Sequence, residues 1–514
     1  MNAIELSLFA SRIEAVCEEM GAVLQRAAFS PNIKDRLDYS CAIFDAQGEL
    51  CAQAAHIPVH LGSMAYAMRD IVRDLSWAPG DMVILNDPYL GGTHLPDVTV
   101  IAPIHVQGTL IGFAANRAHH ADIGAHTPGS MPISRRLTEE GMIIPPTFIY
   151  RQGQLDQVRL DALVAATSNP EQSRGDFAAQ FSANRAGMAR LGALVGAMGA
   201  DVYRQGLIEL NDYAERLAVS ALNEIPDGVY RFRDVMDDDG LETADIPIEV
   251  SVTVKAHHVQ VDFSGTAAQV AGNINCPLSV AAAGVYYVFR CLMPPQTPAC
   301  SGSFRSIHLS APEGSLLNAR RPAAVAAGNV ETSTRVVDVV MGALAQAIPE
   351  RMPAASHGSM NNLAMGSRSD GQSWDYYETL GGGMGGGPDD AGLSGIQTHM
   401  TNTLNTPIEV LETNYPLRIR RYVLRDHSGG LGCHRGGDGL IREFEFLKPA
   451  TVTLLTERRQ HAPWGLQGGE AGTVGCNRHN DKVLPAKVSL QVKAGDRVCV
   501  ETPGGGGWGC VGSG

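Results

Sequence analysis

Histidine and aspartate side chains are concentrated in one stretch of the chain, from Asn86 to His126. Seven of the sixteen histidines fall between positions 56 and 126: His56, His60, His94, His105, His119, His120 and His126. The carboxylates of Asp87, Asp97 and Asp122 lie among them. Imidazole and carboxylate groups without thiolates typically bind a divalent metal that keeps a position open for catalysis. This stretch therefore predicts a metal centre.

A β-hairpin is expected to bring three of these ligands together. Residues 98–106 and 110–115 are apolar and rich in β-branched side chains, and Gln107-Gly108 separates them. A two-residue turn at that point would pair Asp97 with Ala118. His94 and His119 would then lie at the same open end of the ladder, within one or two residues of register.

Two features leave the register and the third ligand open. Pro103 indicates an edge strand or a bulge, and Gln-Gly is a weaker turn signal than Asn-Gly, so the pairing is free to shift by one residue. Successive residues of a strand point to opposite faces. We therefore expect either His119 or His120, and not both, to complete a site with His94 and Asp97. The alternative to metal coordination is that each histidine only makes a structural hydrogen bond within its loop.

The composition restricts the class of protein. With 514 residues the chain exceeds one ordinary core, and a formal net charge of −14 without a basic run disfavours nucleic-acid binding. The N-terminus has no basic or apolar leader, and no apolar run is long enough to span a membrane, so we expect a cytoplasmic protein. The ten cysteines form no Cys-x-x-Cys motif and are expected to be reduced and mostly buried.

The hydrophobic patterns predict an α+β fold of closely packed sections. Helical periodicity covers residues 4–28, 171–198, 202–222, 279–292 and 332–347, and a further helix is expected to end at residue 75. Strand patterns cover residues 40–44, 50–54, 229–235, 246–254 and 259–263. We expect an α+β region with the metal site at 1–150, a helical section at 151–225, an α+β section at 226–375, and a β-rich, glycine-rich section at 376–514.

Other motifs carry less chemistry. The glycine run 381–387 contains G-x-G-x-x-G but continues into Pro388 instead of opening a helix, so we expect tight loops and close backbone approach, in the core or where another subunit docks. The chain contains no P-loop, H-E-x-x-H or G-x-S-x-G motif. Asp237, Asp238 and Asp239 precede a glycine and are expected to be solvated in a turn. Three glutamates lie beside apolar or glycine-rich sequence: Glu378, Glu409 and Glu412. Their spacing alone does not show whether they line a cleft.

Longer motifs show a resemblance to a known family. They are 38–45 (DYSCAIFD), 57–64 (IPVHLGSM), 86–97 (NDPYLGGTHLPD), 119–124 (HHADIG), 128–132 (PGSMP), 139–146 (EEGMIIPP), 262–266 (DFSGT), 377–379 (YET), 401–403 (TNT), 407–412 (PIEVLE) and 503–507 (PGGGG). In these motifs the chain resembles the hydantoinase B or 5-oxoprolinase family, which includes the large subunit of acetone carboxylase. The resemblance covers nearly the whole chain.

The resemblance implies a subunit of a larger enzyme. A hydantoinase A-type partner would bind ATP and Mg and phosphorylate the carbonyl of a cyclic amide, and this chain would complete the hydrolysis within a hetero-oligomer such as A2B2. In the acetone carboxylase relatives a metal is held by a His-x-x-Asp pair and a later histidine. These match His94, Asp97 and His119 here, with His120 as the alternate third ligand. Mn, Zn and Fe all fit such ligands.

The resemblance also suggests roles for neighbouring residues. A bound metal would lower the pKa of water for attack on the activated carbonyl. Asp87 or Asp122 would orient the water or a ligand imidazole, and His120 or His126 would move protons, although a structural hydrogen bond is the alternative for each. His56 and His60 are expected to support the site or the fold.

Two other functions remain open. One is a subunit of an ATP-dependent ketone carboxylase, which the length favours less, since the chain is shorter than the acetone carboxylase large subunit. The other is a non-catalytic scaffold for the partner.

Overall fold

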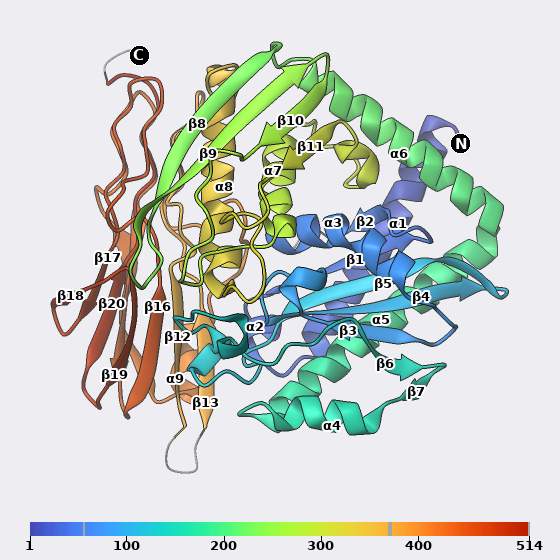
Figure 1. The fold of residues 1–514 in the computed structure, drawn as a ribbon, viewed down its shortest axis with the longest axis horizontal. Helices are drawn as coiled ribbons and strands as arrows, with labels where there is room; N and C mark the ends of the chain where they lie inside the picture. The colour runs from blue at the N-terminus through green and yellow to red at the C-terminus, as the bar shows by residue number, and fades with distance from the viewer. Residues whose placement is uncertain (55–56, 369–372, 512–514) are drawn as a thin grey trace.

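The computed structural model describes residues 1–54, 57–368 and 373–511, and it has the expected α+β fold (Figure 1). A seven-stranded sheet forms one side of the molecule, and two further sheets of the C-terminal part form the other side. The helices α7 (Leu278–Leu292) and α8 (Ser333–Leu344) lie between these regions, beneath a fourth sheet. In the described part of the chain, no helix is both long and apolar enough to cross a membrane.

The seven-stranded sheet carries the hairpin. Its order is β2-β1-β5-β4-β3-β6-β7. The strands are β1 (Tyr39–Asp45), β2 (Leu50–Gln53), β3 (Met82–Leu85), β4 (Asp97–Val106), β5 (Thr109–His119), β6 (Thr147–Arg151) and β7 (Gln154–Leu155). Helices α1 (Ala3–Ala27) and α5 (Pro170–Met198) pack on one face, and α3 (Pro58–Asp74) packs on the other. Burial on both faces explains why β4 and β5 are almost continuously apolar.

The hairpin is confirmed, but its predicted register is wrong by one residue. Near the turn, Val106 pairs with Thr109 as a two-residue turn requires. A bulge between Ile104 and His105 then shifts the ladder, and Asp97 pairs with His119 instead of Ala118. Pro103 was expected to mark either a bulge or an edge strand, and the bulge is confirmed one residue beyond it. The other alternative, an edge strand, is wrong because β4 lies between β5 and β3.

The predicted helical section follows the sheet. It contains α4 (Gln157–Ala165), α5 and α6 (Ala200–Leu222). The start of α5 follows from its sequence, because the Asn169 side chain accepts a hydrogen bond from the Gln172 amide and Pro170 occupies the first turn. Gly199, at a φ of 90°, separates α5 from α6.

The fourth sheet covers α7 and α8 with the order β11-β10-β9-β8. Its strands are β8 (Gly228–Asp238), β9 (Ala244–Lys255), β10 (His258–Asp262) and β11 (Ile307–Ser310). The expectation that the aspartates at its turn are solvated is wrong for Asp237 and Asp239, which are buried. Asp237 accepts hydrogen bonds from the backbone amides of residues 459–461, and Asp239 accepts them from residues 241–243. Asp238 is ion-paired with Lys487.

The C-terminal sheets pack face to face around a shared apolar core. One has the order β13-β12-β16-β19 and the other β14-β15-β20-β17-β18. Their strands are β12 (Asn362–Ser367), β13 (Trp374–Glu378), β14 (Leu417–Arg425), β15 (Gly439–Phe446), β16 (Ala450–Leu455), β17 (Cys476–His479), β18 (Lys482–Leu484), β19 (Lys487–Val492) and β20 (Arg497–Glu501). The expected section boundary at residues 375 and 376 falls inside β13.

The glycine runs pack against one another beside these sheets. Their backbones are joined by hydrogen bonds such as Gly386 to Gly506 and Gly505 to Gly437. A Cβ atom on Gly505 would lie 2.0 Å from the carbonyl oxygen of Met384, and one on Gly383 would lie 1.9 Å from that of Gly437. The predicted close approach of backbones is confirmed, because these positions leave no space for any side chain.

Six of the ten cysteines are buried, as expected, and no disulfide joins cysteines within the described residues.

Candidate metal centre

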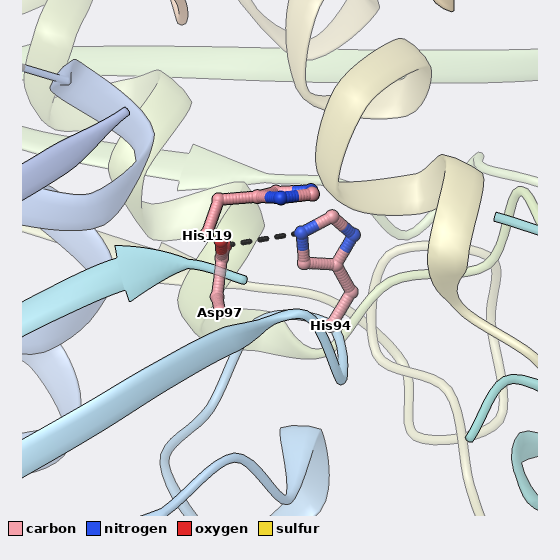
Figure 2. Close-up of side chains that lie close together, drawn as sticks. All are labelled: His94, Asp97 and His119. Carbon is pink, nitrogen blue, oxygen red and sulfur yellow. Dashed lines mark ion pairs between the residues drawn. The ribbon is translucent and has the colours of Figure 1, made fainter. Parts of the chain in front are cut away.

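His94, Asp97 and His119 meet at the open end of the β4–β5 hairpin (Figure 2). One possible ligand atom from each lies within 4.8 Å of the others, and all three residues are buried. His94 Nε2 lies 3.3 Å from Asp97 Oδ2, and the two imidazole rings meet edge to face at 5.1 Å. The pairing of Asp97 with His119, which the bulge produces, holds two of these residues directly opposite each other.

The three side chains fit a divalent ion. His94 Nε2, Asp97 Oδ1 and His119 Nε2 are all buried, and none makes a hydrogen bond with the described residues. Buried polar atoms that make no hydrogen bond are costly, and three of them converging on one place are unusual in the absence of a ligand. Two imidazole nitrogens and a carboxylate oxygen suit a first-row divalent metal with open positions.

The segment 321–329 runs along the loop that carries His94 and fixes that loop. Arg321 is ion-paired with Asp87, and the Tyr89 hydroxyl donates to the Ala323 carbonyl. His94 Nδ1 lies 3.1 Å from the Ala326 carbonyl oxygen. Because a carbonyl can only accept, Nδ1 carries the hydrogen, and the lone pair of a neutral His94 is on Nε2, toward the site.

Asp97 is oriented by two donors. Thr93 Oγ1 donates to Asp97 Oδ2 at 2.7 Å, and Asn329 Nδ2 donates to the same oxygen at 3.1 Å. These bonds engage Oδ2, and Oδ1 makes no hydrogen bond with the described residues. Asn329 lies on a π-helical turn, Gly328–Thr332, and such turns are frequent at functional sites.

His119 is held by contacts from two distant segments. Its ring stacks on the Tyr377 ring at 4.6 Å with an angle of 4° between the planes. The Tyr377 hydroxyl donates to Asn362, which in turn donates to buried Glu331. The Asn32 amide lies 3.1 Å from His119 Nδ1. The nearest Asn32 atom is the amide nitrogen Nδ2, so coordination through Nε2, which would leave the hydrogen on Nδ1, would require the Asn32 amide to turn and present its oxygen as the acceptor.

The electrostatics of the site follow from burial and close charges. Burial lowers the pKa of His119 far below its usual value. Burial also opposes a charge on His94, but the Asp97 carboxylate outweighs it and raises the His94 pKa. Burial alone would raise the pKa of Asp97, whereas His60 and His94 together hold it well below the usual value. His60 Nε2 lies 3.2 Å from Asp97 Oδ1, so His60 contacts the site directly.

Replacing Asn329 by alanine is expected to weaken the affinity for a divalent ion by about 10- to 100-fold, because Asp97 Oδ2 loses one of its two donors. The affinity would be measured by titrating Mn²⁺ or Zn²⁺ into the chelated protein. Asn211→Ala provides a matched control. Asn211 is also buried, but its amide donates to the Leu207 carbonyl within α6 and accepts from the Gly302 backbone amide. An Asn329→Ala variant that binds the ion as tightly as this control would contradict the role of Asn329.

The structure places the other expected residues outside this group. His120 points away, with Nε2 3.0 Å from Gln180 Oε1 and its ring against Phe177. Asp122 accepts hydrogen bonds from Gly124, Ser130 and Ser168. These contacts are those of loop-stabilising groups, and the proton-transfer and orienting roles stay predictions.

Asp87, His105 and His126 also lie apart from the three ligands. Asp87 caps the turn at Tyr89 and pairs with Arg321. His126 is exposed, and His105 lies at the bulge near the other end of the hairpin. His56 lies outside the described residues. Glu378 is buried against Arg442, away from the metal centre.

Asn32, Asn329 and Tyr377 were missed by sequence reasoning. The residues that they contact lie between 87 and 258 positions away in the sequence, and no local periodicity reports such contacts. The one available signal is the sequence 323–333, in which Asn329 and Glu331 interrupt a run of small and apolar residues. His60 was assigned a supporting place, and its contact with Asp97 agrees with that place.

Comparison with known proteins identifies the family. The model of the Hydantoinase B/oxoprolinase family matches residues 2–511. The chain belongs to this family. The resemblance drawn from the sequence motifs is thereby confirmed.

Named relatives extend this result. The chain is 38% identical to 5-oxoprolinase 1 of Arabidopsis thaliana over 544 residues, which is 99% of this chain but 42% of the plant protein. It therefore spans about two fifths of that relative's length. It is 32% identical to a protein of Pseudomonas sp. (strain NS671) that is named as the B subunit of a D-/L-hydantoinase, covering 99% of this chain and 90% of that protein.

Two solved structures share the fold. The ATP-dependent caprolactamase from Pseudomonas jessenii superposes with a TM-score of 0.92 at 27% identity, covering 99% of this chain and 91% of that one. A nucleotide-free acetone carboxylase superposes with a TM-score of 0.88 at 18% identity, covering 99% of this chain and 76% of that one. The second likeness shows the fold alone.

Proposed function

We propose that the chain is the B-type subunit of an ATP-dependent hydrolase that opens a cyclic amide, such as a hydantoin, oxoproline or lactam. A hydantoinase A-type partner would use ATP and Mg to phosphorylate the amide carbonyl, and this chain would complete the hydrolysis at a divalent metal held by His94, Asp97 and His119. The observation that carries the proposal is the convergence, in a chain of this family, of three buried ligand atoms that make no hydrogen bond with the described residues.

The relatives support the reaction class. Those matched include oxoprolinases, a hydantoinase chain and a caprolactamase, whose names all describe amide ring substrates. The name of the caprolactamase supports ATP use, and the name of the hydantoinase chain supports a partner chain. The described residues contain no P-loop motif, which agrees with ATP binding on a different chain.

The side chains of the site have separate tasks in this reaction. A divalent ion, when bound, supplies a Lewis acid that lowers the pKa of water and stabilises negative charge. Thr93 and Asn329 orient the Asp97 carboxylate, and the Ala326 carbonyl fixes the His94 tautomer. His60, 3.2 Å from Asp97 Oδ1, can hold a proton against that carboxylate. Burial of the ligands keeps bulk water away, which strengthens each of these interactions.

A screen for substrates tests the reaction class. The chain is co-purified with an A-type subunit, and ADP release is followed over hydantoins, lactams and ketones. We expect ADP release to be coupled to a ring-opened product for at least one cyclic amide. ADP release with a ketone that consumes bicarbonate would contradict the hydrolase and indicate the carboxylase instead. Acetone carboxylase shares the fold of this chain, so the screen includes ketones, but that likeness shows the fold alone.

A further inference from the structure

Glu140 is a buried carboxylate that is separated from His94 by a single residue of another segment, Ala326. Its side chain is fully buried, whereas that of the neighbouring Glu139 is exposed. Burial of an ionisable carboxyl group costs free energy unless hydrogen bonds and nearby charges compensate for it. The proposed function assigns no role to Glu140, so the groups around it indicate what it does.

One oxygen of Glu140 accepts three hydrogen bonds. The backbone amides of Val325 and Ala326 donate to Oε1 at 2.9 and 3.0 Å. The Ser134 hydroxyl donates to the same atom at 2.8 Å. The other oxygen, Oε2, is buried and makes no hydrogen bond with the described residues. The carboxylate is therefore engaged mainly by the backbone of the segment that contains Ala326.

Backbone contacts place Glu140 beside this segment. The backbone at 136–137 pairs with the backbone at 322–323 through one antiparallel bridge and one hydrogen bond of 3.0 Å. The loop that ends at Glu140 thus runs along the start of the segment 322–326. The hydrogen bonds of Glu140 continue this contact, so its position is set by the fold and not by the reach of a flexible side chain.

Ala326 links Glu140 to the metal centre. Its carbonyl oxygen accepts from His94 Nδ1 at 3.1 Å, and this bond directs the lone pair of His94 Nε2 toward the site. Residues 323–327 read Ala-Ala-Val-Ala-Ala and have no polar side chain to fix the direction of that carbonyl. The direction is fixed from outside, because Glu140 accepts the amide of Ala326 and the Asn273 carbonyl accepts the next amide at 3.0 Å.

The charges of Glu140 and His94 also act on each other. Burial raises the pKa of Glu140 to about 7, and its hydrogen-bond donors and His94 oppose that rise. Burial opposes a charge on His94, while Asp97 and, more weakly, Glu140 raise the His94 pKa. A divalent ion on His94 would favour the ionised form of Glu140, and by reciprocity an ionised Glu140 favours binding of the ion.

We propose that Glu140 is a positioning residue of the metal centre, whose carboxylate holds the backbone of Ala326 so that the Ala326 carbonyl keeps the hydrogen of His94 on Nδ1. In this role Glu140 contacts neither the ion nor the substrate and acts through Ala326. It contributes an acceptor oxygen and a negative charge. The ion on which it acts rests on the proposed function, whereas the contacts that lead from Glu140 to His94 do not.

Variants at Glu140 separate the acceptor from the charge. The affinity of the full-length chain for Zn²⁺ is measured by competition with a chromogenic chelator. Glu140→Met keeps the length of the side chain and removes both oxygens, and we expect the affinity to fall about tenfold or more. Glu140→Gln keeps an oxygen for the two amides and should restore most of the affinity. Glu140→Asp keeps the charge but is too short to reach the amides, and it should bind nearly as weakly as Glu140→Met.

A matched control and a spectrum distinguish this role from a purely structural one. Asp81, just before β3, is also buried and accepts hydrogen bonds from the backbone amides of Ala78 and Gln152. Asp81→Leu should lower the thermal midpoint without changing the Zn²⁺ affinity. The visible absorption of Co²⁺ added to the metal-stripped chain reports the ligand geometry. This absorption should change in Glu140→Met but not in Asp81→Leu.

The measured affinities decide the role of Glu140. Wild-type affinity in a folded Glu140→Met variant, or an equal loss of affinity in Asp81→Leu, would overturn it. If Glu140→Met does not fold, the other two variants decide, and equal or tighter binding by Glu140→Asp than by Glu140→Gln would overturn the proposal. A wild-type chain that binds no Zn²⁺ would contradict the metal centre and this role with it. Affinities in the expected order while the hydrolysis screen fails would contradict only the proposed function.

Discussion

Replacing His94 and Asp97 together by alanine is expected to remove the divalent metal and to abolish hydrolysis, while the partner still binds ATP. The double variant leaves His119 as the sole remaining ligand of the three, and one imidazole does not hold a divalent ion against water. Metal content is measured by elemental analysis of the purified chain, and ATP binding is measured on the reconstituted complex. Loss of metal is expected to be complete, and the rate of ring opening should fall by about a thousandfold or more.

Two single variants sharpen this experiment. His119→Ala is expected to lose the metal, whereas His120→Ala is expected to keep it, because His120 faces Gln180 and Phe177. Both residues are buried neighbours, so the two variants carry a similar risk to the fold. Unchanged metal content in the double variant would rule out the assignment of the ligands. Loss of metal in His120→Ala but not in His119→Ala would show that the other histidine is the ligand.

Replacing Gly505 by alanine is expected to destabilise the protein strongly. The new Cβ would lie 2.0 Å from the Met384 carbonyl oxygen and 2.7 Å from the Gly385 nitrogen. The Met384 carbonyl accepts a hydrogen bond from the Gly437 amide, and the Gly385 amide donates to the Ser356 hydroxyl, so neither backbone atom can move alone. We expect the thermal unfolding midpoint to fall by roughly 5 °C or more, or the variant to become insoluble.

Gly192→Ala is the matched control. Gly192 lies inside α5, and among the described residues no atom outside its own stretch of helix lies within 4 Å of the position its Cβ would take. The same substitution should therefore leave the midpoint unchanged or raise it slightly, since alanine is the better helix former by about 1 kcal/mol. Equal midpoints for the two variants would contradict the tight packing of the glycine segments.

The sequence predicts the elements and the meeting of His94, Asp97 and His119 well, because both depend on local pattern. The apolar runs around Gln107-Gly108 specify the hairpin, and the hairpin brings His94, Asp97 and His119 to one end. The exact register depends on a bulge after Ile104, which the sequence indicates only through Pro103. That single-residue shift pairs His119 with Asp97.

The surroundings of the centre were not predictable in the same way. Asn329, Tyr377 and Asn32 contact the ligands from distant parts of the chain. The buried Asp237 was taken for a solvated residue because its partners, the backbone amides of residues 459–461, lie more than 220 residues away. A local pattern reports which face of an element is apolar, but not which distant segment packs there.

Restoring metal to the chelated complex tests the central claim most directly. The chain and its A-type partner are stripped with a chelator, and Mn, Zn or Fe is then added in known amounts while the ring-opened product is measured. We predict that activity is lost on chelation and returns in proportion to bound metal, reaching its maximum at one ion per chain. Full activity in the metal-free complex would contradict a catalytic metal at His94, Asp97 and His119 and would favour a scaffold role for this chain.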